Sequence, residues 1–198
     1  PIRGRAFGLH RGADHLGAVV GSLVAFELLR RGTPVRQVLG LSLVPGAIAA
    51  VVLVAALRTV RADGNGVPVA SLDPPGLVPR APVVWLAALA AARLPETLLL
   101  LRLQDLGASI TAIPLIWALL HIVKSLASYP AGVAADRLGP ARTLALGSVA
   151  YAVAMLGLAA VSKPTLAVAV FLAYGLAGGL LEPAERAAVA AVVPTRRG

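Results

Sequence analysis

The sequence predicts an all-α membrane protein, a polytopic bundle of six transmembrane helices. Of its 198 residues, 58% are hydrophobic and 14% are charged, whereas about a quarter are charged in a typical soluble domain. So few charged side chains cannot cover a surface that faces water. Lipid requires the backbone to be satisfied within helices or closed barrels. The apolar residues form continuous runs without alternation, which favours helices over barrel strands.

Six apolar runs are long enough to cross a bilayer, which takes about 20 residues of helix. The predicted helices cover residues 7–29, 38–57, 81–103, 111–131, 143–161 and 165–193. The sixth helix is long enough to tilt, or to bend at Gly178, Gly179 or Pro183.

One long connection, 58–80, is rich in glycine, proline and aspartate and is typical of a flexible linker. The other connections are a few residues each, which favours antiparallel neighbours in a bundle. The sequence therefore predicts three parts: two helices in 1–57, a cytoplasmic linker in 58–80, and four helices in 81–198.

The net charge of +9 is carried mostly by residues at the ends of the apolar runs. Lysine and arginine are more numerous on the side that holds residues 132–142, although Arg30, Arg31 and Arg36 cluster on the other side. The positive-inside rule then places residues 132–142 and both termini in the cytoplasm, with the chain crossing the bacterial inner membrane several times. No nucleic-acid-binding motif accompanies the charge. The chain has no cysteine, which excludes disulfides and thiolate metal sites. We expect no cofactor.

A polar tract, Gly132-x-x-x-Asp136-Arg137-x-Gly139-x-x-Arg142, joins the fourth and fifth predicted helices. Glycines allow close helix approach and a tight turn. An aspartate can pair with a basic residue or cap a neighbouring helix, and arginines suit bidentate pairing and anionic headgroups. The tract is thus either a gate that holds one conformation or a turn that sets topology through positive charge.

This tract resembles the cytoplasmic signature loop of the major facilitator superfamily of secondary transporters. The opening Arg3-Gly4-Arg5 and the spaced glycines Gly12, Gly17 and Gly21 resemble the family's fifth helix. On that register the chain carries family helices five to ten, as a fragment that ends the N-terminal half and begins the C-terminal half. Family members have two six-helix halves around a central cavity, which they expose alternately to each side.

The resemblance implies secondary active transport of a small solute by alternating access, coupled to protons, as part of a major-facilitator-type permease. The implied partners are the lipid bilayer, a small-molecule solute and protons, together with the missing transporter helices or a second copy. Helices eleven and twelve of the family are repeat equivalents of five and six. The first two helices here are therefore candidates to fill their places in a permuted six-helix half.

Charged residues at membrane depth are the main candidates for a substrate or proton pathway, because each costs about 2.5–3.5 kcal/mol at a helix centre on insertion scales. At membrane depth the positive and negative residues are equal in number, which predicts that they form ion pairs. The pathway candidates are Arg93, Glu96, Lys124, Glu182, Glu185 and Arg186, with Arg11 and Asp14 as a possible further pair.

The family resemblance places the third and sixth helices here around the central cavity, so Glu96 and Glu182 become candidates for proton coupling or cation recognition. The alternative is that Arg93–Glu96 and Glu182–Arg186 are structural pairs within one helix, at i, i+3 and i, i+4. Arg11 and Asp14 suit an interfacial pair near the headgroups. Lys124 needs a partner at its depth, and we predict contact with Glu96.

Two other kinds of function stay open. The chain could be a non-transporting membrane subunit or truncated remnant that only packs with partner helices. Separately, Gly17 and Gly21 form a small-residue seam that lets helix backbones approach closely. An intramembrane metallo-hydrolase would use glutamates with His10, His15 and His121. The HExxH motif is absent and these histidines fall on different predicted helices. We therefore expect no enzyme and no bound metal.

Overall fold

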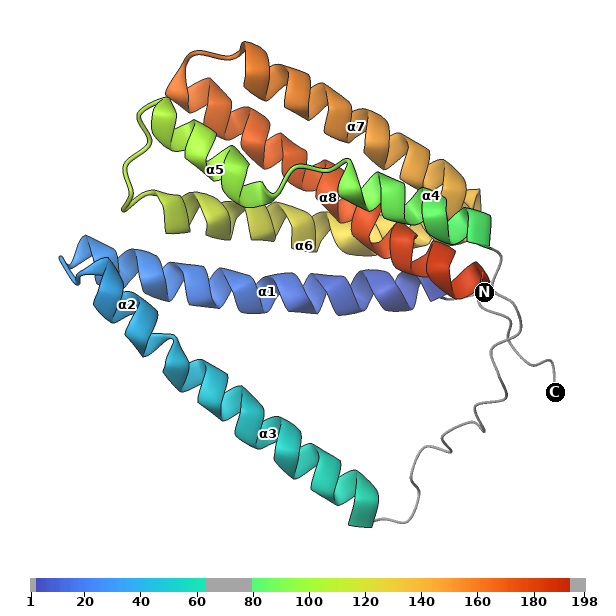
Figure 1. Ribbon diagram of the computed structural model, residues 1–198, viewed down its shortest axis with the longest axis horizontal. Coiled ribbons are helices and arrows are strands. Elements are labelled where there is room, and N and C mark those ends of the chain that lie inside the picture. The colour runs from blue at the N-terminus through green and yellow to red at the C-terminus, as the bar shows by residue number, and fades with distance from the viewer. Residues whose placement is uncertain (1–2, 63–79, 193–198) are drawn as a thin grey trace.

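A computed structural model describes residues 3–62 and 80–192, and every regular element in these ranges is a helix (Figure 1). The predicted all-α class is confirmed. The helices are α1 (Arg3–Arg30), α2 (Val35–Leu41), α3 (Leu43–Ala62), α4 (Arg80–Ala91), α5 (Glu96–Asp105), α6 (Ile113–Leu138), α7 (Pro140–Ala160) and α8 (Pro164–Val192).

Six spans in the described ranges are long and apolar enough to cross a membrane, as predicted. Four of them are single helices, and two are composite: Val35–Thr59 joins α2 and α3 at Ser42, and Val83–Asp105 joins α4 and α5. α8 continues through Pro183 without interruption.

The prediction of one continuous helix over 81–103 is wrong. The chain leaves the helix after Ala91 and resumes at Glu96, behind Pro95. Proline lacks an N–H and disfavours helical geometry in the residue before it, so the helix ends at this point. The backbone N–H of Leu94, freed by the break, donates to the hydroxyl of Tyr151 on α7 at 2.8 Å. The break therefore leaves Arg93 outside both helices and makes Glu96 the first residue of α5.

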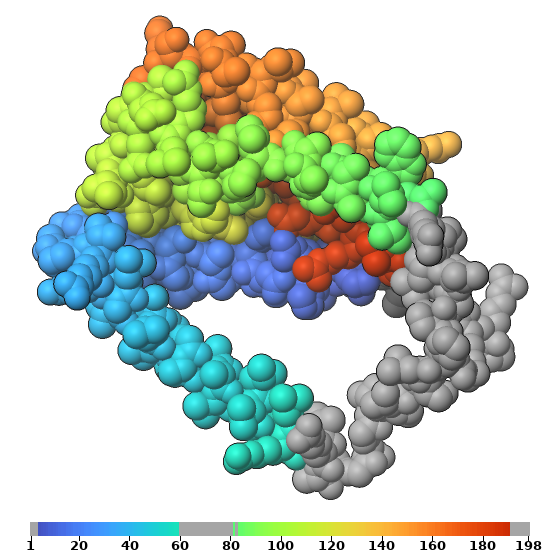
Figure 2. Space-filling model, in the orientation of Figure 1, coloured from blue at the N-terminus to red at the C-terminus, as the bar shows by residue number. Residues whose placement is uncertain are grey.

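α6 and α8 form the centre of the bundle, with α1 packed along α6, α7 along α8, and the α4–α5 segment against α8 (Figures 1 and 2). Apolar side chains from α5, α6, α7 and α8 make one buried cluster around Phe171 and Leu120. A second cluster, around Leu181 and Ala184, joins the C-terminal part of α6 to α7 and α8. These clusters hold the helices on which the buried charges lie.

α1 and α6 cross at backbone contact through small residues. A β-carbon placed on Gly4 would lie 2.4 Å from the carbonyl oxygen of Gly132, and one on Gly8 would lie 2.5 Å from that of Ser128. Farther along the crossing, Ser125 donates to the carbonyl of Gly12 at 2.9 Å. The predicted seam at Gly17 and Gly21 packs against no helix of the described chain, because no atom beyond their own helix lies within 4 Å of a β-carbon built there.

α3 diverges from the bundle, and its described side chains are exposed along their whole length (Figure 1). The idea of a permuted six-helix half therefore fails for the second span, although α1 does pack on α6 and α8. Residues 58–62 continue α3, so the predicted linker begins later than Arg58. The remainder of that linker, 63–79, lies outside the described residues.

Candidate functional site

Lys124 of α6 lies at the centre of a cluster of charged side chains between the helices. Its side chain is 3% exposed, and its ammonium group contacts Glu96 Oε1 on α5 and lies 3.0 Å from Glu182 Oε1 on α8. The hydroxyl of Tyr174 donates to the same oxygen of Glu96 at 3.0 Å. The predicted contact between Lys124 and Glu96 is confirmed. One buried cation thus holds two carboxylates that come from different helices.

Two side chains of α1 complete this cluster. The guanidinium of Arg11 contacts Glu182 Oε2, and His15 Nε2 lies 3.3 Å from the same oxygen. Arg11 and Lys124 then balance Glu96 and Glu182, so the ionised cluster is electrically neutral. This neutrality reduces the large penalty of placing single charges in an apolar surrounding.

The helices are shaped to admit the Lys124 side chain. Gly178 of α8 faces it, and a β-carbon on Gly178 would lie 2.7 Å from Lys124 Cε. Tyr174, Gly178 and Glu182 follow one another at intervals of four residues, which places them on one face of α8. The lysine stem therefore occupies the space left by a missing side chain, between the hydroxyl and the carboxylate that flank it.

The proposed intrahelical pairs do not form. Glu96 and Glu182 contact Lys124, and Arg93 pairs with Glu185 of α8, with Arg93 Nη2 2.6 Å from Glu185 Oε1. Arg93 lies in the break between α4 and α5, whereas Glu96 begins α5. Arg186 is exposed. Arg93–Glu185 is therefore a second long-range pair, from the break to α8, and Arg186 lies apart from the central cluster.

Two buried histidines adjoin the central cluster. His15 and His121, of α1 and α6, are 4% and 8% exposed, and their Nδ1 atoms lie 3.0 Å apart. The ring of His121 packs edge-on against Trp117 at 4.9 Å between centroids. Within the described residues, no group of three or more potential ligands is arranged to hold a metal ion.

The polar tract at the end of α6 contacts the start of α1. Asp136 accepts hydrogen bonds from the backbone N–H groups of Gly4 at 2.8 Å and of Arg5 at 3.1 Å, so it caps the N-terminus of α1. Gly132 forms the close crossing with Gly4. Asp136 therefore makes the helix-capping contact that the sequence suggested.

The other members of the tract serve the turn or face outward. Gly139 has φ +89°, a left-handed conformation that favours glycine, and Pro140 begins α7 directly after it. Arg137 and Arg142 are exposed. Arg11 pairs with Asp14 at 3.1 Å, as foreseen, but Arg11 also reaches inward to Glu182.

Sequence reasoning missed Tyr174 and the pairing of His15 with His121. The interval of four residues from Tyr174 to Gly178 and on to Glu182 was a usable signal for the tyrosine. The histidines lie on helices distant in the sequence, and only the crossing of α1 with α6 brings them together.

The described residues form six membrane-length spans, and charged side chains pair between the packed helices. These features define the class: a polytopic membrane protein of the transporter type. The family model described as Major Facilitator Superfamily matches residues 94–198, slightly more than half of the chain. The chain therefore belongs to the major facilitator superfamily and derives from a transporter of that type. Comparison with curated proteins and with solved structures gave no match.

Proposed function

We propose that this chain is part of a secondary active transporter that moves a small solute by alternating access, coupled to protons through Glu96 and Glu182. The observation that carries the proposal is the bridging of both carboxylates by the buried Lys124. The two glutamate side chains keep 21% and 18% exposure, so water or solute can reach them while the lysine stays covered. Protonation of either carboxylate removes one of the two negative charges that hold Lys124 and Arg11.

The second element of the proposal is a gate at the α1–α6 crossing. Asp136 caps α1 where Gly4 and Gly132 touch, and a carboxylate at a helix N-terminus is stabilising. Separation of α1 from α6 would expose this end of the bundle and break the cap. The cap therefore favours the conformation in which the two helices are closed.

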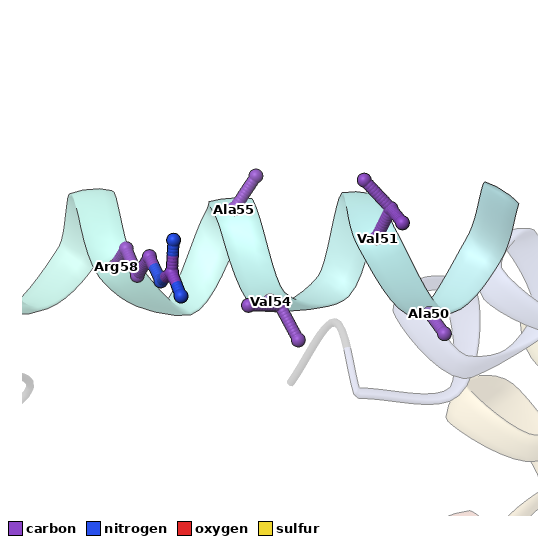
Figure 3. A pocket seen from close by; sticks show the side chains of 5 residues that line it. All are labelled: Ala50, Val51, Val54, Ala55 and Arg58. Carbon is purple, nitrogen blue, oxygen red and sulfur yellow. The ribbon is translucent and has the colours of Figure 1, made fainter. Parts of the chain in front are cut away.

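Lipid is the partner that the outer surface supports. Figure 3 shows Ala50, Val51, Val54 and Ala55 along α3, with the side chain of Arg58 near its C-terminal end. Apolar side chains with a terminal arginine suit a lipid-facing helix whose charge reaches the headgroups. We place that end and the Asp136 tract on the cytoplasmic side of a bacterial inner membrane. Transport also requires the remaining family helices or a second copy, because α3 is uncovered on all sides.

The test is gradient-driven solute flux in vesicles that contain the full-length protein. Glu96→Gln and Glu182→Gln should each abolish proton-driven flux while insertion is retained. Glu27→Gln is the matched control, because Glu27 lies at the outer end of α1 and pairs only with Arg30 and Arg31 among the described residues. Unchanged flux in both variants would show that Glu96 and Glu182 are structural pairs.

A further inference from the structure

The His15–His121 pair is the buried titratable feature that the proposed transport site leaves unused. The two Nδ1 atoms face each other at 3.0 Å, so one ring must donate and the other accept. Each neutral imidazole carries one N–H and one bare nitrogen. Two Nδ1–H groups would clash, and two bare Nδ1 atoms would repel each other. The geometry therefore fixes one shared proton between the rings.

This sharing limits what the pair can hold. In its neutral form it has one Nδ1–H between the rings and one further proton on the Nε2 of the accepting ring. A single additional proton can bind at the remaining Nε2, and a second would require two opposed donors. The pair is thus a store for one proton.

The two Nε2 atoms lie in different surroundings. That of His15 is 3.3 Å from Glu182 Oε2, although it is not aligned for a hydrogen bond. That of His121 is buried without a hydrogen-bond partner among the described residues, beside the Trp117 ring. His121 lies almost a full turn before Lys124 on α6, on the side away from the Asp136 tract. The pair thus extends from the central carboxylate toward the opposite end of the bundle.

We infer that His15 and His121 form a one-proton relay that leads from Glu182 toward the end of the bundle opposite the Asp136 tract. When the bundle opens at that end and water reaches His121 Nε2, a proton binds there. The shared proton then crosses from His121 Nδ1 to His15 Nδ1, and the proton on His15 Nε2 passes to Glu182 Oε2. One proton enters and one reaches the carboxylate, and the reverse steps return it. A small turn of the His15 ring aligns its N–H with Glu182.

The charges around the relay support this direction. Glu182 of α8 lies 3.3 Å from His15 Nε2 and contacts Arg11 of α1 and Lys124 of α6. Lys124 also contacts Glu96 of α5, to which Tyr174 donates, and Arg11 also pairs with the more exposed Asp14. With both carboxylates ionised the surroundings are neutral, so the pair can stay neutral. A proton arriving on the rings meets two cations, and its transfer to Glu182 removes it from the imidazoles.

The relay rests on the proposed proton-coupled transport and is tested with His15→Asn and His121→Asn in the full-length protein. Asparagine can keep a hydrogen bond at the Nδ1 position but cannot carry a proton. His10→Asn is the matched control, since His10 is 63% exposed on the same helix. Proton-driven flux should fall at least about tenfold in the first two variants, because a positioned proton carrier typically contributes about 10²–10⁴-fold. Solute exchange without a proton gradient and flux in His10→Asn should stay at the wild-type level.

Nitrogen-15 NMR of histidine-labelled protein provides a readout independent of flux. The wild-type signals that disappear in His15→Asn and in His121→Asn belong to these two rings. In the wild type they should show one proton shared between the two Nδ1 atoms, and uptake of one proton by the pair on acidification. Wild-type flux in both asparagine variants, or uptake of two protons, overturns the relay while the transporter proposal stands. Absence of proton-driven flux in the wild type refutes the proposed function. The NMR titration then tests by itself whether the histidine pair binds one additional proton.

Discussion

Replacing Lys124 with methionine should lower the free energy of unfolding more than replacing Lys163, the other lysine of the chain. Methionine keeps much of the stem that packs against Gly178 but removes the charge between Glu96 and Glu182. Glu182 retains Arg11, whereas Glu96 retains only the hydroxyl of Tyr174 among the partners that the described residues offer. Removing one partner of a buried ion pair costs about 3–5 kcal/mol. We expect about 3 kcal/mol, the lower end, because the two carboxylates keep 21% and 18% exposure.

The assay is denaturant unfolding of the full-length protein in a mild detergent. Lys163→Met is the control, because Lys163 is exposed ahead of α8 and its loss should leave stability near wild type. The double variant Lys124→Met with Glu96→Gln should recover about 1–2 kcal/mol, since the uncompensated carboxylate is gone and residues in contact are not additive. Equal stability of the two lysine variants, or strict additivity in the double variant, refutes the reasoning.

Two other perturbations test the packing around the site and the gate. Gly178→Ala should displace Lys124 and reduce proton-driven flux, because the new β-carbon would lie 2.7 Å from Lys124 Cε. Gly46→Ala is the control, since its β-carbon meets no atom within 4 Å outside its own helix, and it should match wild-type flux. Equal flux in the two variants would contradict the close packing of Lys124 on Gly178. Asp136→Ala should lower the free energy of unfolding by about 0.5–2 kcal/mol, because it removes a helix cap. It should also speed alkylation of a cysteine introduced at the buried Ser128. An unchanged alkylation rate would mean that the cap does not hold α1 and α6 together.

The six spans were predictable from sequence because hydrocarbon imposes a minimum length of apolar helix, and each run met it. The break at residues 92–95 was only partly encoded: Pro95 disfavours a helix that continues through it, but Pro130 and Pro183 lie inside continuous helices. The break holds Arg93 itself and leaves Glu96 at the start of α5, and each pairs with a residue of a different helix, Glu185 of α8 and Lys124 of α6.

The pairing itself was only partly predictable. Lys124 and Glu96 belong to successive predicted spans, so their contact followed from the short connection between them. Glu182 and Arg11 are 171 residues apart, and no spacing rule relates them. The choice of Gly4 and Gly8 over Gly17 and Gly21 as the close crossing also depends on where α6 lies beside α1. Sequence spacing gives a small-residue stripe but does not give the partner that covers it.

Glu182 and Glu96 differ in which helices they connect, and this difference separates their roles. Glu96 contacts Lys124 and Tyr174, on α6 and α8, which both belong to the C-terminal half on the proposed register. Glu182 also contacts Arg11 of α1, which belongs to the N-terminal half. Movement between the halves must break the Arg11 contact and can leave the Glu96 contacts intact.

Glu182→Gln should therefore weaken the closed state and speed alkylation of a cysteine at Ser128, because an amide cannot replace the ionic contact with Arg11. Glu96→Gln should leave that rate near the value of the cysteine variant alone, while both substitutions stop proton-driven flux. Equal acceleration by the two substitutions would mean that the carboxylates act on the crossing as one unit through Lys124. Unequal acceleration assigns the coupling between proton binding and helix movement to Glu182, the carboxylate that also faces His15.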